Sequence, residues 1–203
     1  MKVCIRTWII LMLVLGSQGL SAQLTKWNVG VSYGFGNNAF FGIENSIAYS
    51  YDVKLYELKI TYRIKEGDNW AWDFVGNPQY NTSDMTDPEN NFLSKSGYEF
   101  GLNLGVALRY KMSNTVHPYF LLSAGPHYIS ESLIRQSPGF IFSDNFELGF
   151  SVAIAKKVLI EPNIGFRHLS NASLKSPNNG INNFIYGVSI LFNLSNDKDD
   201  KTD

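Results

Sequence analysis

Apolar and polar residues alternate along much of this chain of 203 residues, in stretches of about ten residues separated by turn-like sequences. The clearest stretch is 98–111, where the even positions from Phe100 to Tyr110 are large and apolar and the odd positions between them are Gly, Asn, Ala or Arg. Successive side chains of a β-strand point to opposite faces, so this period of two predicts a strand with one apolar face. The same pattern, weaker at 70–74 and 117–130, predicts seven more strands at 27–36, 56–64, 70–74, 117–130, 146–154, 158–170 and 184–194.

The connections between these strands alternate in length. Residues 65–68, 112–115 and 155–157 form short links, whereas 37–53, 77–96, 131–139 and 171–182 are longer. In bacterial outer-membrane barrels the short turns face the periplasm and the long loops face outside. The lengths therefore predict that odd-numbered strands run outward and even-numbered strands run inward.

The apolar faces carry Phe, Tyr and Trp near the strand ends, as the interfacial girdles of membrane barrels do. The other faces carry Gly, Ser, Asn and charges of both signs, which suits the interior of a narrow barrel. A soluble β-sandwich also alternates, but it needs no such girdles. No apolar run after residue 22 is long enough for a transmembrane helix, so a membrane location requires a closed barrel. We predict an all-β fold, an eight-stranded antiparallel transmembrane β-barrel.

The first 22 residues have the three parts of a secretory signal peptide. Lys2 and Arg6 are basic, residues 8–15 are apolar, and the small residues of 19–22 form a cleavage site. The apolar run is far shorter than the ~20 residues of a spanning helix. We therefore expect a signal peptide at 1–22, an outer-membrane β-barrel at 23–194, and a charged, disordered tail at 195–203. The expected location is the bacterial outer membrane.

Composition argues against several classes of function. Segment 1–22 holds two basic and no acidic residues, so the rest of the chain has 15 basic and 18 acidic residues, a net charge of −3. This balance gives no indication of nucleic-acid binding. The only cysteine, Cys4, lies in the predicted signal peptide, so the mature chain offers no disulfide and no thiolate ligand.

The apolar row of 158–170 continues into two polar residues, His168 and Ser170. A polar side chain on a lipid-facing surface is costly. One explanation is that the strand leaves the membrane here. The other is chemistry, because residues i and i+2 on one face lie roughly 6.5–7 Å apart at Cα, so an imidazole nitrogen can reach a serine hydroxyl. On the inner row, Arg167 is expected to be a lumenal ion-pair partner.

The other two histidines are weaker candidates for chemistry. We expect His117 in a periplasmic turn, and His127 pointing into the lumen or at the girdle. Because the sequence shows no spaced cluster of His and carboxylate residues, it predicts no metal centre.

Residues 166–182 read FRHLSNASLKSPNNGIN. This stretch resembles the signature of the outer-membrane lipid A 3-O-deacylases, the PagL family. That signature is His-x-Ser-Asn-Ala, a short spacer with Leu-Lys, then Pro-Asn-x-Gly-Ile and an acidic residue. The strand order from the second strand onward is also similar to that family, although 37–53 and 77–96 look longer.

The resemblance implies an enzyme that hydrolyses the ester of the 3-linked 3-hydroxyacyl chain of lipid A, with a Ser-His-Glu triad on the barrel exterior. By position, Ser170 is the nucleophile, His168 is the general base, and Asn171 is a candidate for the oxyanion hole. The implied partner is the lipid A of lipopolysaccharide in the outer leaflet, whose phosphates Lys175 and Arg167 would attract. For Arg167, on the inner row, the lumenal ion pair is the favoured alternative. No metal or cofactor is implied. The sequence does not fix the oligomeric state, and a homodimer is kept beside a monomer.

Asn182 stands where the family has its acid. An amide oxygen can accept the imidazole N–H and hold the tautomer, but it supplies no negative charge. Three alternatives follow: Asn182 serves in the acid's place, another carboxylate such as Asp144 reaches the histidine, or the enzyme is weak or inactive. The competing function is a non-catalytic barrel with an adhesion or structural role through its loops. A transport channel is disfavoured because eight strands leave little lumen.

Overall fold

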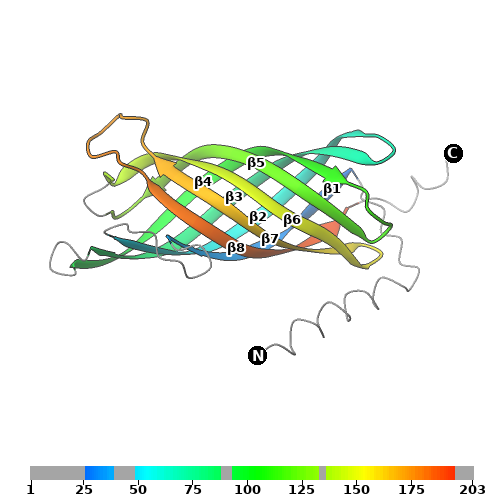
Figure 1. The fold of residues 1–203 in the computed structure, drawn as a ribbon, viewed down its shortest axis with the longest axis horizontal. Helices are drawn as coiled ribbons and strands as arrows, with labels where there is room; N and C mark the ends of the chain where they lie inside the picture. Colours follow the sequence, from blue (N-terminus) through cyan, green and yellow to red (C-terminus); the bar gives the residue numbers. More distant parts are fainter. Residues whose placement is uncertain (1–25, 39–48, 88–92, 133–135, 195–203) are drawn as a thin grey trace, which may run out of the picture.

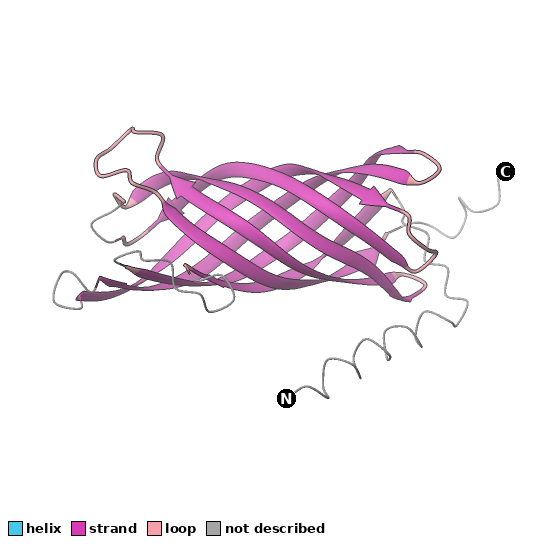
Figure 2. Cartoon of the chain, viewed as in Figure 1, coloured by secondary structure: helices cyan, strands magenta, loops and turns pink. Residues whose placement is uncertain are grey.

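The structure is a computed structural model, and it describes residues 26–38, 49–87, 93–132 and 136–194. Its strands are β1 (Trp27–Asn37), β2 (Ser50–Glu66), β3 (Trp70–Asp87), β4 (Leu93–Tyr110), β5 (Val116–Ile129), β6 (Gly139–Ala155), β7 (Val158–Ser170) and β8 (Ile181–Asn193). Each strand pairs antiparallel with the next, and β8 pairs with β1, so the sheet closes (Figures 1 and 2). The predicted eight-stranded antiparallel barrel is confirmed. The predicted signal peptide at 1–22 and tail at 195–203 lie outside the described residues.

None of the described residues forms a helix that is long and apolar enough to cross a membrane.

The strands are strongly tilted relative to the barrel axis (Figure 1). A line of directly paired residues starts at Leu108 on β4, passes through β5, β6, β7, β8, β1, β2 and β3, and returns to β4 at Tyr98, ten residues away. A stagger of this size over eight strands corresponds to a tilt of roughly 35–45° and to a narrow barrel whose interior side chains fill it. The interior is therefore a packed core.

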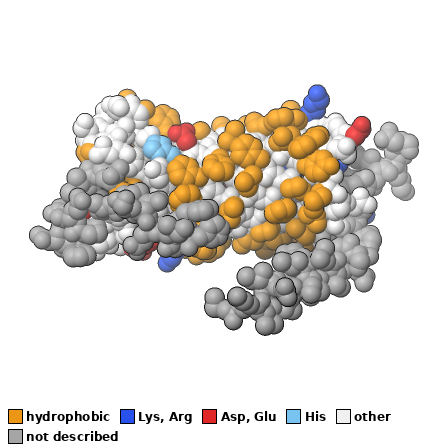
Figure 3. Space-filling view, in the orientation of Figure 1, with side chains coloured by type: hydrophobic (Ala, Val, Ile, Leu, Met, Phe, Trp, Pro, Cys, Tyr) orange, Lys and Arg blue, Asp and Glu red, His pale blue; other side chains and the backbone are white. Residues whose placement is uncertain are grey.

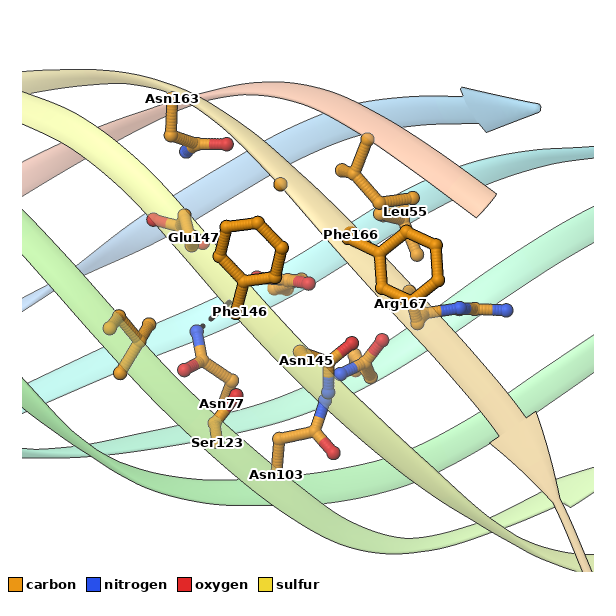
Figure 4. A pocket seen from close by; sticks show the side chains of 15 residues that line it. Leu55, Asn77, Asn103, Ser123, Asn145, Phe146, Glu147, Asn163, Phe166 and Arg167 are labelled. Atoms are coloured by element: carbon orange, nitrogen blue, oxygen red, sulfur yellow. Dashed lines mark hydrogen bonds between the residues drawn. The ribbon is translucent and has the colours of Figure 1, made fainter. Parts of the chain in front are cut away.

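Charged and polar side chains fill the lumen towards the periplasmic end. Arg109 contacts Asp73 at 2.5 Å and Glu161 at 2.7 Å, and Lys59 contacts Glu161 at 3.0 Å and Glu147 at 3.3 Å. A cavity of about 40 Å³ remains further up, and Figure 4 shows the polar side chains from several strands around it. These contacts compensate the buried charges, as a polar barrel interior requires.

Arg167 points into the same lumen from β7. Its guanidinium lies 2.8 Å from Glu99, and both residues are fully buried. Glu99 also accepts hydrogen bonds from Tyr51 and, at 3.0 Å, from Asn81. The predicted role of Arg167 as a lumenal ion-pair partner is confirmed.

The alternation of apolar and polar residues inverts at the outer end of the barrel. Tyr51, Val53 and Leu55 of β2 are buried in the lumen, whereas Asp52 and Lys54 between them are exposed on the outside. An apolar cluster closes the lumen here; it consists of Tyr49, Tyr51, Val53, Leu55, Met85, Ile129, Ile141, Leu169 and Ile181. An apolar interior under a polar exterior is the pattern of a barrel in water, so we infer that this end stands above the membrane.

This outer extension corrects part of the loop prediction. β2 already begins at Ser50, β3 continues to Asp87 and β4 begins at Leu93, so much of 77–96 is strand. The sequence hid these segments because both faces of β3 are polar there: Asn81 and Ser83 point inward, and Thr82 and Asp84 point outward. A strand without an apolar face has no period-two signal. β6 and β8 also begin earlier than predicted, at Gly139 and Ile181.

A band of apolar side chains covers the outer wall of the barrel (Figure 3). Aromatic pairs mark both of its edges. Trp27 packs against Tyr62 and Trp70 against Tyr110 near the short turns, and Tyr33–Tyr56, Phe35–Tyr186, Tyr80–Tyr98 and Phe100–Tyr128 pack near the outer end. Two such girdles are typical of outer-membrane barrels.

Candidate active site

His168 and Ser170 lie on the exterior face of β7, near its outer end. Arg167 and Leu169 point into the lumen with 1% and 0% of their surface exposed, while His168 and Ser170 are half-buried on the opposite face. Ser170 is paired with Phe142 of β6, which packs edge-on against Phe140. The two side chains therefore lie beside the outer aromatic girdle, where lipid meets water.

Asn182 holds the imidazole of His168 from the neighbouring strand. The two residues are directly paired between β7 and β8, and His168 Nδ1 lies 2.7 Å from Asn182 Oδ1. An amide oxygen only accepts hydrogen bonds, so Nδ1 carries the proton and Nε2 is left as the basic nitrogen. Asn38 Nδ2 in turn donates to the Asn182 carbonyl oxygen at 3.1 Å, which fixes the outer end of β8.

Gly180 packs closely against the same imidazole. Its φ is +72°, and a Cβ built on it would lie 2.5 Å from His168 Cε1 and 3.2 Å from Nε2. Only glycine combines this backbone conformation with such a close approach. The ring of His168 is thus held by a hydrogen bond at one edge and by backbone packing near the other.

Asp144 flanks His168 from β6, on the side away from Asn182. The two residues are directly paired and share the exterior face. Asp144 is exposed and has no hydrogen-bond or ion-pair partner among the described residues. Figure 3 shows a histidine and an acidic side chain together on the outer surface of the barrel.

The side chain of Ser170 makes no hydrogen bond to His168 or to any other described residue. In enzymes without bound substrate, the contact between nucleophile and base is often long and tightens only in the complex. The structure thus brings His168 together with Asn182 and places Ser170 beside them on one face.

The chain turns sharply directly after Ser170. Leu174 N donates to Asn171 O at 3.0 Å, and the two central residues of this turn, Ala172 and Ser173, have φ values of 51° and 63°. Two consecutive left-handed residues define a type I′ turn, which strongly favours Asn and Gly. Strained backbone of this kind is a frequent feature of functional sites.

Asn171 is the buried anchor of the loop that follows β7. Its backbone N–H donates to Asn178 Oδ1 at 2.8 Å, and its Nδ2 donates to the carbonyl of Lys175 at 2.6 Å. Only 1% of its surface is exposed. One proton of Nδ2 is therefore used inside the loop, which ties this side chain to the backbone of Lys175.

The same loop is also tied to the connection between β5 and β6. Asn178 bridges to Gln136, and both the N–H and the hydroxyl of Ser137 donate to the carbonyl of Pro177 at 2.9 Å. These contacts fix the loop over the outer end of β7.

The family model described as lipid A 3-O-deacylase (PagL) matches residues 46–190. The chain belongs to this family. The match includes β7, the loop after it and Asn182, so the whole candidate site lies inside it. No curated protein matches the chain.

Two solved structures share the fold of this lipid A 3-O-deacylase family member. The outer membrane enzyme PagL has a TM-score of 0.53 and 13% identity, with 82% of this chain and 99% of that chain covered. Neisserial surface protein A has a TM-score of 0.56 and 12% identity, with 84% and 98% covered. At these identities the likeness establishes the outer-membrane β-barrel fold alone.

An apolar groove runs along the outer wall beside the candidate site of this PagL-family chain. Its volume is about 620 Å³, and His168 and Asp144 lie along it. The other lining residues are mostly apolar or small: Leu104, Gly105, Val106, Leu122, Ser123, Ala124, Asn145, Phe146 and Phe166. The groove is therefore chemically suited to a hydrocarbon chain.

The other two histidines lie in the lumen. His127 contacts Asn103 at 3.1 Å, as predicted for a lumenal side chain. His117 was expected in a turn, but it is the second residue of β5 and contacts the Ser113 carbonyl oxygen at 2.8 Å. The described residues hold no group of three or more His, Cys, Asp and Glu residues that would bind a metal ion.

Sequence reasoning missed two features of the site. Gly180 was part of the motif, but its contact with His168 depends on where β8 begins. Asn178 was likewise part of the motif without a role, and it receives the backbone N–H of Asn171. A Gly two residues before a candidate triad member was the only available signal for the first, and nothing in the sequence pointed to the second.

Proposed function

We propose that this chain is an outer-membrane esterase that removes the 3-O-linked 3-hydroxyacyl chain from lipid A. His168 is the base and Ser170 the nucleophile, on the outside of the barrel. The observation that carries this proposal is the hydrogen bond from His168 Nδ1 to Asn182, which leaves Nε2 as a proton acceptor two residues from Ser170 on one face. The family match supports the substrate.

The reaction follows the logic of serine hydrolases. Ser170 Oγ attacks the ester carbonyl carbon while His168 Nε2 takes the hydroxyl proton, giving a tetrahedral oxyanion. Collapse breaks the bond to the sugar oxygen, which receives the proton from His168, and an acyl-serine remains. Water then attacks this ester with His168 again as base, and it releases the fatty acid and free Ser170.

We assign the stabilisation of the oxyanion to hydrogen-bond donors in the loop directly after Ser170. The second proton of Asn171 Nδ2 and the backbone N–H groups of the strained turn at Ala172 and Ser173 are the donors nearest in sequence to the nucleophile. Donors that are fixed before the reaction stabilise developing charge without reorganisation. The anchoring of this loop by Asn178 and Ser137 supports this role.

The surroundings of the site fit lipid A in the outer leaflet. The acyl chain would lie in the apolar groove beside His168, and the sugar ester would lie at the level of the outer girdle, which water reaches from above. Lys175, exposed on the loop and without an ion-pair partner among the described residues, is available to lipid phosphates. A cation near anionic lipid headgroups adds binding energy.

We expect Asn182 to reduce the rate of ester hydrolysis less than an Asn at the acid position of a catalytic triad usually does. In serine proteases, replacing the triad Asp with Asn reduces kcat by about 10⁴ because the histidine adopts the wrong tautomer. Here Asn182 presents its oxygen to Nδ1, so the productive tautomer is kept. The remaining deficit is the missing negative charge.

A second candidate, a non-catalytic barrel with an adhesion or structural role, is favoured by one observation, the neutral Asn182 at the position of the family's acid. Its loops would carry the function. It differs from the esterase in predicting that the chain leaves lipid A unchanged.

The test is the mass of lipid A from a Gram-negative host that expresses the chain. We expect the loss of one 3-hydroxyacyl chain, and we expect Ser170→Ala and His168→Ala to abolish it because each removes a reacting group. Ser96→Ala, an exposed serine on the exterior of β4, is the matched control and should keep the activity. Unchanged lipid A with a folded, membrane-inserted barrel would refute the proposal.

A further inference from the structure

We infer that Asp144 is a positioning residue that supplies, through space, the negative charge that Asn182 does not supply to His168. This inference rests on the proposed esterase function. A triad acid normally orients the histidine and stabilises its positive charge, and here two residues share these functions. Asn182 orients the imidazole from β8, and Asp144 stabilises the imidazolium from β6.

The register places His168 between these two residues. Asp144 is paired with His168 on one side, and His168 is paired with Asn182 on the other. Residues paired directly on one face have Cβ atoms about 4.5–5.5 Å apart. Asp144 and His168 are thus direct neighbours on one face without a direct ion pair between them, and the hydrogen bond at Nδ1 is already taken by Asn182.

Asp144 is out of place in its own row. The exterior positions of β6 are Phe140, Phe142, Asp144, Phe146, Leu148, Phe150, Val152 and Ile154. Every member except Asp144 is apolar, and charged residues on the lipid face of a barrel are costly. An ionisable residue at such a position is therefore more readily explained by function than by stability.

The neighbouring strands offer Asp144 no other charge to pair with. Its partner on β5 is Ala124, and the exterior row of β5 from Pro118 to Tyr128 contains no charged residue. On β7 the exterior row from Ile160 to Ser170 contains His168 as its only group able to become positive. The small side chain of Ala124 also leaves the carboxylate unobstructed in the groove.

The apolar groove strengthens the interaction. Around Asp144 and His168 it is lined by Phe146, Phe166 and Leu122, which keep the effective dielectric constant well below that of water once a lipid covers the site. At such separations a carboxylate then favours the imidazolium formed in the transition state by roughly 10- to 100-fold in rate.

A double-mutant cycle on the purified, refolded barrel tests this inference, with kcat and KM measured on lipopolysaccharide in detergent micelles. We expect Asp144→Asn, which keeps the shape, to lower kcat by roughly 10- to 100-fold with little change in KM. Asn182→Glu restores the charge at the other side, so in that background Asp144→Asn should cost less than about 3-fold. Asp144→Glu should keep most of the activity, because a charge acting through space tolerates a longer side chain.

Four results would overturn the inference. The first is a kcat that Asp144→Asn leaves unchanged, and the second is an equal cost in both backgrounds. The third is an effect mainly on KM, which would make Asp144 a substrate-binding residue instead. A chain that is inactive until Asn182→Glu is introduced would also overturn it, while leaving the Ser170 and His168 assignment intact. If neither the native chain nor Asn182→Glu deacylates lipid A although folded, the proposed function itself has failed.

Discussion

At the scale of single residues, the site depends on how tightly His168 is confined. Nδ1 of the ring is held by Asn182 at 2.7 Å, and the Cε1 and Nε2 side of the ring faces Gly180. A general base must hold its free nitrogen within hydrogen-bond reach of the nucleophile. Confinement of the ring by Asn182 and Gly180 meets this requirement for the proposed base.

We expect Gly180→Ala to reduce activity by about 10²-fold, because a shift of the base of about 1 Å costs this much. The added Cβ would lie 2.5 Å from Cε1 of His168 and must displace the ring. The measurement is lipid A deacylation by purified variants of verified fold. Gly139→Ala is the matched control: its φ is also positive, +109°, but no atom lies within 4 Å of the added Cβ. Equal losses in both variants would show that backbone strain, and not displacement of His168, is responsible.

At the scale of elements, the sequence predicts strands where lipid faces one side and fails where water faces both. β7 matches its predicted range because Ile160 to Phe166 alternate against a polar lumen. The outer half of β3 has no apolar row, so its sequence shows no period-two pattern that would predict a strand. For the same reason the sequence did not predict the position of Asn182 in the candidate site. Asn182 was expected in a loop, and its place opposite His168 follows from the start of β8 at Ile181, which only the closed barrel fixes.

The turn after β7 gives a prediction at this scale. Ala172 and Ser173 occupy left-handed conformations that cost non-glycine residues roughly 1–2 kcal/mol each. We expect Ser173→Gly to raise the free energy of unfolding by about 1 kcal/mol, measured by urea unfolding in phospholipid vesicles. Ser96→Gly, in the regular part of β4, should have the opposite sign because glycine weakens a strand. A destabilising Ser173→Gly would mean that the turn is not strained.

At the scale of the whole molecule, the lumen and the outer wall have separate tasks. Buried charges and the apolar cluster at the outer end fill the inside, while His168, Ser170 and the groove use the outside. Arg167 and His168 are neighbours in sequence, yet one pairs with Glu99 inside the barrel and the other with Asn182 outside it. Under the proposed function, stability and activity therefore depend on opposite faces of the same strands.

This separation predicts that a lumenal substitution destabilises the barrel without changing its chemistry. Arg109→Met removes one of two positive partners from both Asp73, which keeps Arg63, and Glu161, which keeps Lys59. We expect this loss in a buried network to cost about 3–5 kcal/mol of unfolding free energy. Lys111→Met, whose pair with Glu66 is partly exposed, should cost less than about 1 kcal/mol. Both are measured by urea unfolding in vesicles, alongside kcat for lipid A deacylation at low urea. A kcat that falls with stability in Arg109→Met, while the barrel is still folded, would show that the lumenal network also shapes the outer wall at His168.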